Sequence, residues 1–289
     1  MGLTITLGIT LLIGFLLIKF NSVHDEAGKF KKNLEYVRFD TNAVLTENEL
    51  KRRMDLAGLG KYWHPLASYI QQDVSIKTAV KSEEEIPLGK SKIGGFPHLN
   101  ASAAVPTEGV FFCQINCSEV ANLKKNDFFP DKGMLYFFLH PQKMAQEKTD
   151  AVSVLYLENQ DDMCLRKEVM PMPEVKPCVL QFFQSASLPD YESEVVQNLL
   201  KDYEIDAYFK VNNQEQSHKL FGYPNTISQN FALKNDQYLL LQLDSEEHSG
   251  MLWKNMGRIY VFAYKDDAKN RSFGKISAYV QGYEAEKES

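Results

Sequence analysis

The sequence predicts an α+β fold of mainly antiparallel strands, built from an internally duplicated unit and accompanied by N-terminal helices and a transmembrane helix. Three observations lead to this prediction: a motif that occurs twice, a period-two alternation within each copy, and an uncharged apolar run at the N-terminus. We therefore expect three regions along the chain. They are a transmembrane anchor over residues 1–20, a helical polar segment over residues 21–90, and a strand-rich domain over residues 91–289.

The duplication is visible when residues 92–140 are compared with residues 218–264. Each stretch has a Gly-aromatic-Pro turn, then an apolar run that contains a glutamine, and then a Gly-x-x-Tyr sequence that opens a second apolar run. The corresponding residues are Gly95-Phe96-Pro97 and Gly222-Tyr223-Pro224, Gln114 and Gln242, and Gly133 with Tyr136 and Gly257 with Tyr260. A motif repeated in the same order indicates a duplicated supersecondary unit.

Both glutamines lie in runs that alternate with period two, which is typical of strands. The alternation places Gln114 and Asn116 on one face of the first copy, and Gln242 and Asp244 on the equivalent face of the second. A buried amide must find hydrogen-bond partners, because leaving one unsatisfied costs about 1 to 3 kcal/mol. Each glutamine could therefore bond to the backbone of its own repeat near the Gly-x-Pro turn. Alternatively, these four side chains and His218 could line a ligand-binding cleft between the repeats, and we take the five as candidate ligand-binding residues.

The apolar run from Leu3 to Ile18 is uncharged and is followed by several basic residues. It is close to the length that spans a bilayer core, and the aliphatic stem of Lys19 can extend it. The basic residues that follow place the C-terminal part on the cytoplasmic side, which predicts a single-pass membrane protein. A cleaved signal peptide is the alternative, although no basic residue precedes the run and no clear cleavage motif follows it.

Composition argues against several classes of partner. The net charge of −6 is spread along the chain without a long block of one sign, so we expect no binding to nucleic acid. The four cysteines form no Cys-x-x-Cys pair and are typical of reduced, mostly buried thiols. We therefore predict no metal site, and the sequence does not indicate a cofactor.

Motifs that carry catalysis are scarce. The sequence has no Walker loop, no Gly-x-Gly-x-x-Gly, no Gly-x-Ser-x-Gly, no His-Glu-x-x-His and no EF-hand pattern. The densest ionisable cluster is Asp244, Glu246, Glu247 and His248. Such a group could hold a hard cation or act as general acid and base, but a solvated turn after a strand has the same composition.

The order of these motifs resembles the bacterial YwqG-like proteins, the family of domain of unknown function 1963. The resemblance covers about Ser91 to Val280 and rests on the two Gly-x-Pro turns, the two glutamine strands and the two Gly-x-x-Tyr strands. It implies an α+β fold rich in antiparallel strands, and it implies no established reaction.

Two functions of different class follow from this sequence. The first is a membrane-tethered, cytoplasm-facing binding or protein-interaction module, whose partner is a protein or a small ligand. The second is a hydrolase-like enzyme that uses Asp244, Glu246 or His248 in a cleft between the repeats. The two differ in whether those side chains converge in one concave site or point into solvent.

Overall fold

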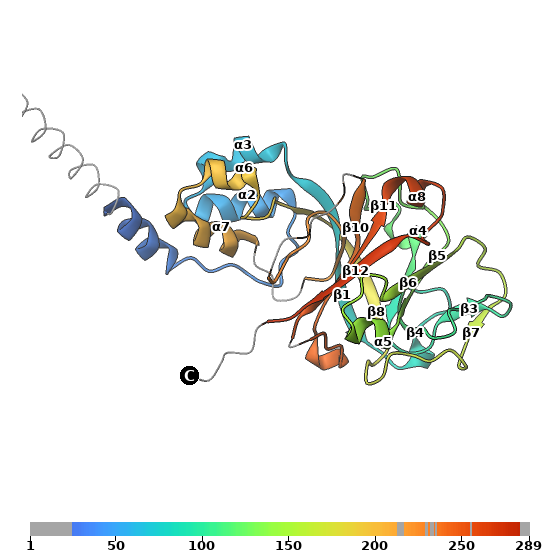
Figure 1. The fold of residues 1–289 in the computed structure, drawn as a ribbon. Helices are drawn as coiled ribbons and strands as arrows, with labels where there is room; N and C mark the ends of the chain where they lie inside the picture. Colours follow the sequence, from blue (N-terminus) through green and yellow to red (C-terminus); the bar gives the residue numbers. More distant parts are fainter. Residues whose placement is uncertain are drawn as a thin grey trace, which may run out of the picture. The chain divides into compact units, whose positions relative to one another are not determined.

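The computed structural model describes residues 25–212, 217–228, 231, 234, 236–254 and 256–283. These residues form two compact units, a helical one and a sheet one. The helical unit comprises residues 25–40, 48–68 and 191–212, and the sheet unit comprises the remainder. Figure 1 shows the elements of both units.

The helical unit contains four labelled α-helices: α2 (Glu47–Leu56), α3 (Trp63–Ala67), α6 (Glu194–Leu199) and α7 (Ile205–Asn212). Its centre is polar as well as apolar. The Arg53 side chain is fully buried, and its guanidinium pairs with Glu49 at 2.9 Å and donates to the carbonyl oxygen of Val211 at 3.1 Å. These bonds satisfy a charge that would otherwise be costly to bury.

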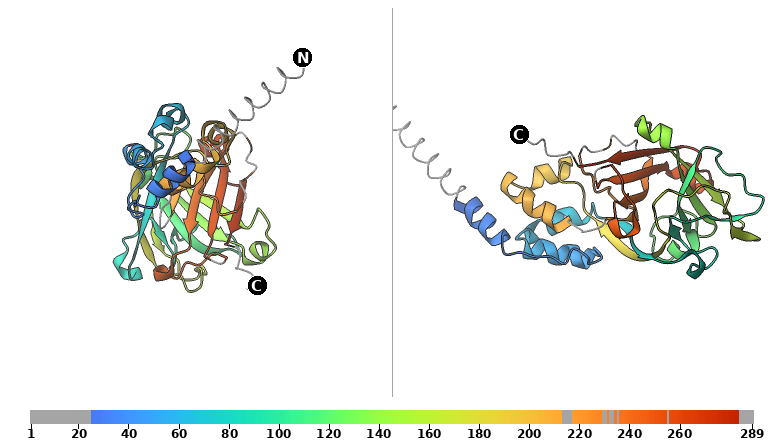
Figure 2. Two further views of the ribbon diagram at one scale, coloured as in Figure 1. Left: turned by 90° about the vertical axis from the view of Figure 1, so that its left-hand side faces the viewer. Right: turned by 90° about the horizontal axis from the view of Figure 1, so that it is seen from below.

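The sheet unit is one ten-stranded sheet in which every neighbouring pair is antiparallel. Its strands, in spatial order, are β12 (Ile276–Gln281), β11 (Arg258–Tyr264), β10 (Gln237–Asp244), β9 (Lys219–Phe221), β1 (Gln71–Val80), β8 (Cys178–Ser187), β2 (Lys92–Ile93), β4 (Val110–Asn116), β5 (Met134–Leu139) and β6 (Val152–Leu157). The sheet curves strongly (Figure 2), and the Ala278 amide at one edge donates to the Thr149 carbonyl beside the other at 2.7 Å. The sheet is therefore nearly closed on itself.

The remaining elements of the sheet unit are short. They are a hairpin of β3 (His98–Asn100) and β7 (Met163–Leu165), the helices α4 (Cys117–Val120), α5 (Pro141–Ala145) and α8 (Lys265–Lys269), and two 3-10 turns at Glu83–Glu85 and Glu247–Ser249. The main apolar core lies on one face of the sheet and draws on both repeats. Phe112 and Trp253, for example, are in edge-to-face contact with their ring centroids 5.8 Å apart.

The duplication organises the sheet. On one side of the central pair β1 and β8 lie β2, β4 and β5 of the first copy, followed by β6. On the other side lie β9, β10 and β11 of the second copy in the same order, followed by β12. β1 precedes the first copy in the chain but pairs with β9 of the second, and β8 precedes the second copy but pairs with β2 of the first. This exchange joins the two copies into one sheet.

The predicted fold class is wrong in two respects. The larger unit is a nearly closed, wholly antiparallel sheet with a few short helices. Its proportion of strand to helix is therefore higher than in an α+β fold. The segment 21–90, predicted to be helical, also contains β1, the central strand of the sheet.

The predicted transmembrane helix also needs correction. Across the described part of the chain, no helix combines the length and the apolar character needed to cross a bilayer. The predicted anchor over residues 1–20 itself lies outside the described residues. The described residues therefore provide no helix that supports a single-pass membrane protein, membrane binding through an N-terminal helix or a cytoplasm-facing domain.

Candidate functional site: a pocket beside the edge strand β12

Gln114 is fully buried on β4 and is held by the turn of its own repeat. Its side-chain oxygen accepts from the His98 amide at 2.8 Å, and its side-chain nitrogen donates to the Lys90 carbonyl at 2.7 Å. The Tyr136 hydroxyl, on the next strand, donates to the carbonyl of the same His98 at 2.6 Å. The glutamine therefore fastens the Gly-x-Pro loop to the sheet.

Gln242 makes the same bonds on β10. Its oxygen accepts from the Asn225 amide at 2.9 Å, and its nitrogen donates to the Ser217 carbonyl at 2.5 Å. The Tyr260 hydroxyl donates to the Asn225 carbonyl at 2.8 Å. Both strands also bulge two residues before the glutamine, at Phe111/Cys113 and at Leu239/Leu241. The structure thus shows the backbone-bonded alternative for both glutamines.

A buried lysine stands opposite each glutamine on the neighbouring strand. Lys92 faces Gln114 and pairs with Glu83, while Lys219 faces Gln242 and lies 3.7 Å from Asp73. Burial lowers the pKa of both lysines, and the facing carboxylates oppose that shift. The sequence analysis did not single out these lysines, although each stands two residues after the residue whose carbonyl binds the glutamine.

Asn116 and Asp244, two places after the glutamines, are engaged as well. The Asn116 side chain donates to the Gly89 carbonyl at 2.8 Å and caps α4 by accepting from the Ser118 amide. The Asp244 carboxylate accepts from the Ser217 amide at 3.1 Å and lies 2.9 Å from the Arg258 guanidinium. Both side chains thus position loops of their own repeat.

His218 is buried between two acidic residues of the second repeat. Its Nδ1 accepts from the Asp244 amide at 2.9 Å, so the ring proton is on Nε2. Nε2 lies 3.4 Å from the Oε1 atom of Glu246. Glu246 is also buried and accepts from the Thr78 hydroxyl at 2.5 Å. Burial raises the pKa of the Glu246 carboxyl. Hydrogen bonds from His218, Ser249 and Thr78 outweigh this effect of burial and hold the pKa at about 2.

These candidate residues do not meet in one cleft. Gln114 and Gln242 lie on β4 and β10, which are five strand positions apart in the sheet. At about 4.8 Å per strand this separation is roughly 24 Å along the sheet. Within the described residues, no group of three or more His, Cys, Asp or Glu side chains is arranged to hold a metal ion. The five candidates therefore hold loops in place in two separate copies.

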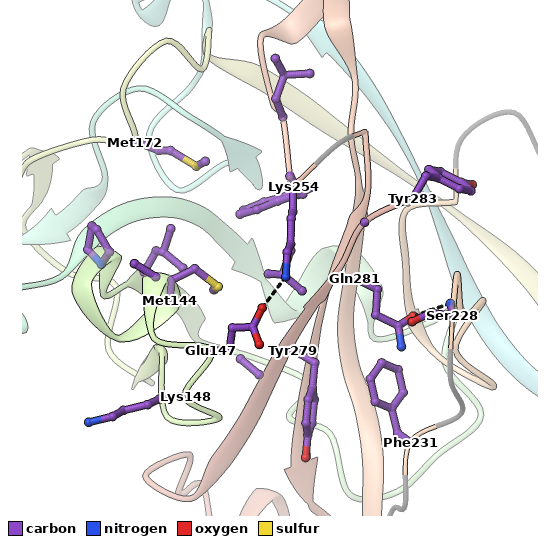
Figure 3. A pocket seen from close by; sticks show the side chains of 18 residues that line it. Met144, Glu147, Lys148, Met172, Ser228, Phe231, Lys254, Tyr279, Gln281 and Tyr283 are labelled. Atoms are coloured by element: carbon purple, nitrogen blue, oxygen red, sulfur yellow. Dashed lines mark hydrogen bonds and ion pairs between the residues drawn. The ribbon is translucent and has the colours of Figure 1, made fainter. Parts of the chain in front are cut away.

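A pocket of about 1100 Å³ lies elsewhere, at the place where the sheet stops short of closing. We call it the seam pocket; it is enclosed by α5 and the loop after it, β12 and the residues that follow, and the loop before Gly257. Its lining residues are Leu139, Pro141, Met144, Ala145, Glu147, Lys148, Met172, Ser228, Phe231, Leu252, Trp253, Lys254 and 278–283. Figure 3 shows Met144 and Met172 on one side of β12 and Phe231 and Gln281 on the other.

The seam pocket has a charged rim and a lining that combines apolar and polar groups. Lys254 pairs with Glu147 across the opening (Figure 3), and both side chains are more than half exposed. Inside, Met144 and Met172 supply flexible thioether side chains that adapt to varied shapes. The pocket is therefore suited to a partly apolar occupant.

Trp253 is the most deeply buried aromatic residue of the seam pocket, at 4% exposure. Its indole Nε1 is buried and has no hydrogen-bond partner among the described residues. A buried N–H group without a partner costs free energy, so such groups are uncommon in native proteins. Trp253 thus combines a place in the pocket lining with a buried N–H group that no described residue accepts.

The sequence did not indicate this pocket. Its walls come from parts of the chain more than a hundred residues apart, and only the curvature of the sheet brings Met144 close to β12.

Comparison with protein families supports the sequence resemblance. The sequence profile described as "Domain of unknown function (DUF1963)" matches residues 91–281, about two thirds of the chain. The chain belongs to the DUF1963 family. The match to DUF1963 includes both repeats and most of the seam pocket lining, but it begins after β1. A search of curated proteins finds no match.

Proposed function

We propose that this DUF1963 protein is a binding module that holds a partly apolar ligand in the seam pocket. The observation that carries the proposal is the pocket itself: a cavity of ligand size, with two methionines and a buried tryptophan in its walls and one charged pair at its rim. Concave sites that place polar groups beside apolar side chains are typical of ligand sites.

The chemistry of the side chains favours binding over catalysis at this place. Glu246 and His218 are bonded to each other and lie outside the lining of the seam pocket. The acidic residue of the lining, Glu147, is exposed and pairs with Lys254. The lining instead provides apolar side chains, the buried Trp253 and an exposed ion pair. Such groups can select and orient a ligand.

The test uses 8-anilinonaphthalene-1-sulfonate, a fluorescent apolar anion, titrated onto the folded chain. We expect saturable binding at one site. Met172→Glu, which places a charge in the pocket wall, should weaken that binding by at least about tenfold, because the charge must be desolvated when the apolar probe enters.

Met170→Glu is the matched control, because Met170 lies two residues away, is exposed and does not line the pocket. Its affinity for the probe should equal that of the unmodified chain. Equal affinities in all three proteins, or no saturable binding by the unmodified chain, would overturn the proposal.

A further inference from the structure

The edge strand β12 is only partly covered. Its register with β11 is unbroken from Ile276 to Gln281. The Ala278 amide points away from β11, because it donates to the Thr149 carbonyl. In an antiparallel strand, the N–H and C=O groups of a residue point to the same side, and this side alternates from residue to residue. The main-chain groups of Val280 therefore also face away from β11.

Although β6 approaches β12, no strand in the described part of the chain pairs with Val280 on the side away from β11. The chain that approaches the edge at Thr149 belongs to the segment just before β6, and upstream of it the residues form α5 in place of a further strand. Among the described residues, no hydrogen bond from another element reaches the main chain of Val280. The edge is thus open beside the seam pocket, which Val280 itself lines.

The seam pocket has a compartment on each face of β12. Ala278 and Val280 belong to the face that packs on the main core, where Met144 and Met172 also pack. Tyr279 belongs to the opposite face, where its ring lies 4.9 Å from the ring of Phe231. Figure 3 shows these two sides separated by the strand.

An extended peptide has the same alternation. If its backbone pairs with Val280, successive side chains point to opposite faces of the enlarged sheet. One side chain would then enter the compartment of Met144, Met172 and Trp253, and the next would lie near Tyr279 and Phe231. A compact ligand could fill one compartment but would leave the edge groups of Val280 unpaired.

We propose that the ligand of the seam pocket is an extended peptide segment of a partner protein, which adds to β12 as a further strand. This inference rests on the proposed function, because it names the class of ligand that the same pocket takes. The main-chain bonds to Val280 give affinity, and alternate apolar side chains of the peptide give selectivity. The partner is thus recognised by an exposed strand-forming segment with apolar residues at every second position.

The test uses a pool of capped pentapeptides that alternate threonine with leucine, methionine, phenylalanine or valine. Binding to the full chain is measured by affinity selection with mass spectrometry, and the selected peptides are then titrated. We expect selected peptides to bind, and their fully N-methylated forms to lose at least about tenfold in affinity, because methylation removes the main-chain donors.

Two variants of the chain separate backbone pairing from side-chain contact. Val280→Pro removes the edge N–H, and proline is tolerated on the open side of an edge strand. Val280→Ala keeps the N–H and shortens the side chain. We expect Val280→Pro to lose at least about tenfold in peptide affinity, and Val280→Ala to stay within about threefold of the unmodified chain.

Titration of each variant with 8-anilinonaphthalene-1-sulfonate shows whether the pocket is intact. Probe binding without any peptide binding, or equal peptide affinity after N-methylation, would overturn the peptide inference and leave the proposed function standing. Absence of both peptide and probe binding to the unmodified chain would overturn the proposed function itself. If Val280→Pro fails to bind the probe, the N-methylated peptides alone decide the question.

Discussion

At the scale of single residues, Glu246 shows how burial and hydrogen bonding set an ionisation state. The carboxyl is buried, which alone would favour the neutral form, but His218 and Thr78 bond to the ionised form. Its pKa is accordingly held at about 2. The Nε2 atom of His248 lies 3.4 Å from the other carboxylate oxygen of Glu246, and the His248 side chain is exposed to solvent.

The low pKa of Glu246 predicts a specific loss of stability in acid. A carboxyl whose pKa is lower in the folded state stabilises the fold above its unfolded-state pKa, near 4.3, and loses this contribution as the pH falls toward the folded-state value. The unfolding free energy of the unmodified chain should decrease as the pH falls from about 5 to about 2. We expect the decrease for Glu246→Gln to be smaller by about 1 to 3 kcal/mol. Urea unfolding across this range measures the difference.

Glu247→Gln serves as the control for this prediction, because Glu247 is the exposed neighbour of Glu246. Its unfolding free energy should follow that of the unmodified chain at every pH. Parallel curves for Glu246→Gln and the unmodified chain would show that Glu246 does not contribute to the acid transition.

At the scale of elements, the repeated glutamine network explains why the Gly-x-Pro turns and the glutamines occur together. Each amide joins two backbone groups of a loop that has little regular structure of its own. Glycine is required in these turns: Gly95 and Gly222 both have positive φ, and a Cβ on Gly222 would lie 2.8 Å from the Asp73 side chain. The turn and the glutamine strand therefore form one structural unit.

We expect Gln114→Ala and Gln242→Ala to destabilise the sheet unit by similar amounts, about 2 to 4 kcal/mol each. Each substitution leaves a buried backbone N–H and C=O without partners, and each such group costs about 1 to 3 kcal/mol. Gln184→Ala, on an exposed strand position, should change the unfolding free energy by less than about 0.5 kcal/mol. Chemical unfolding compares the three, and a cost at Gln242 no larger than at Gln184 would refute the structural role.

The sequence predicted these repeated elements well because period-two alternation and turn residues act locally. Gln114 and Gln242 were correctly placed on strands, and the hydroxyls of Tyr136 and Tyr260 make matching hydrogen bonds. β1 was missed, because it lies in the segment 21–90, which was predicted to be helical, and one side of the strand is largely polar. Such a strand is specified mainly by its neighbours in the sheet.

The candidate site could be predicted less well than the fold. The sequence indicated the polar side chains nearest to the repeated motifs, and the structure shows that these side chains hold the loops. The seam pocket depends on long-range closure of the sheet, which brings Met144 beside Val280. Local sequence patterns carry no information about this approach, because it depends on the curvature of ten strands.

At the scale of the whole molecule, the exchange of β1 and β8 decides what the minimal folded chain is. β1 pairs with β8 over ten residues and also with β9, so it joins the two repeats at the centre of the sheet. The match to the DUF1963 family begins at residue 91 and does not include β1. The family boundary and the structural boundary of the sheet therefore differ.

This difference predicts the behaviour of truncated chains. A chain of residues 91–289 lacks β1, which exposes the edges of β8 and β9 and removes Val74 and Ile76 from the core, so we expect no cooperative unfolding transition. A chain of residues 41–289 keeps β1 and the preceding segment, where the Leu45 carbonyl accepts from the Ala186 amide, and should unfold cooperatively. Thermal unfolding followed by circular dichroism distinguishes the two. Cooperative unfolding of the shorter chain would show that the sheet can form without β1, the shared neighbour of β8 and β9.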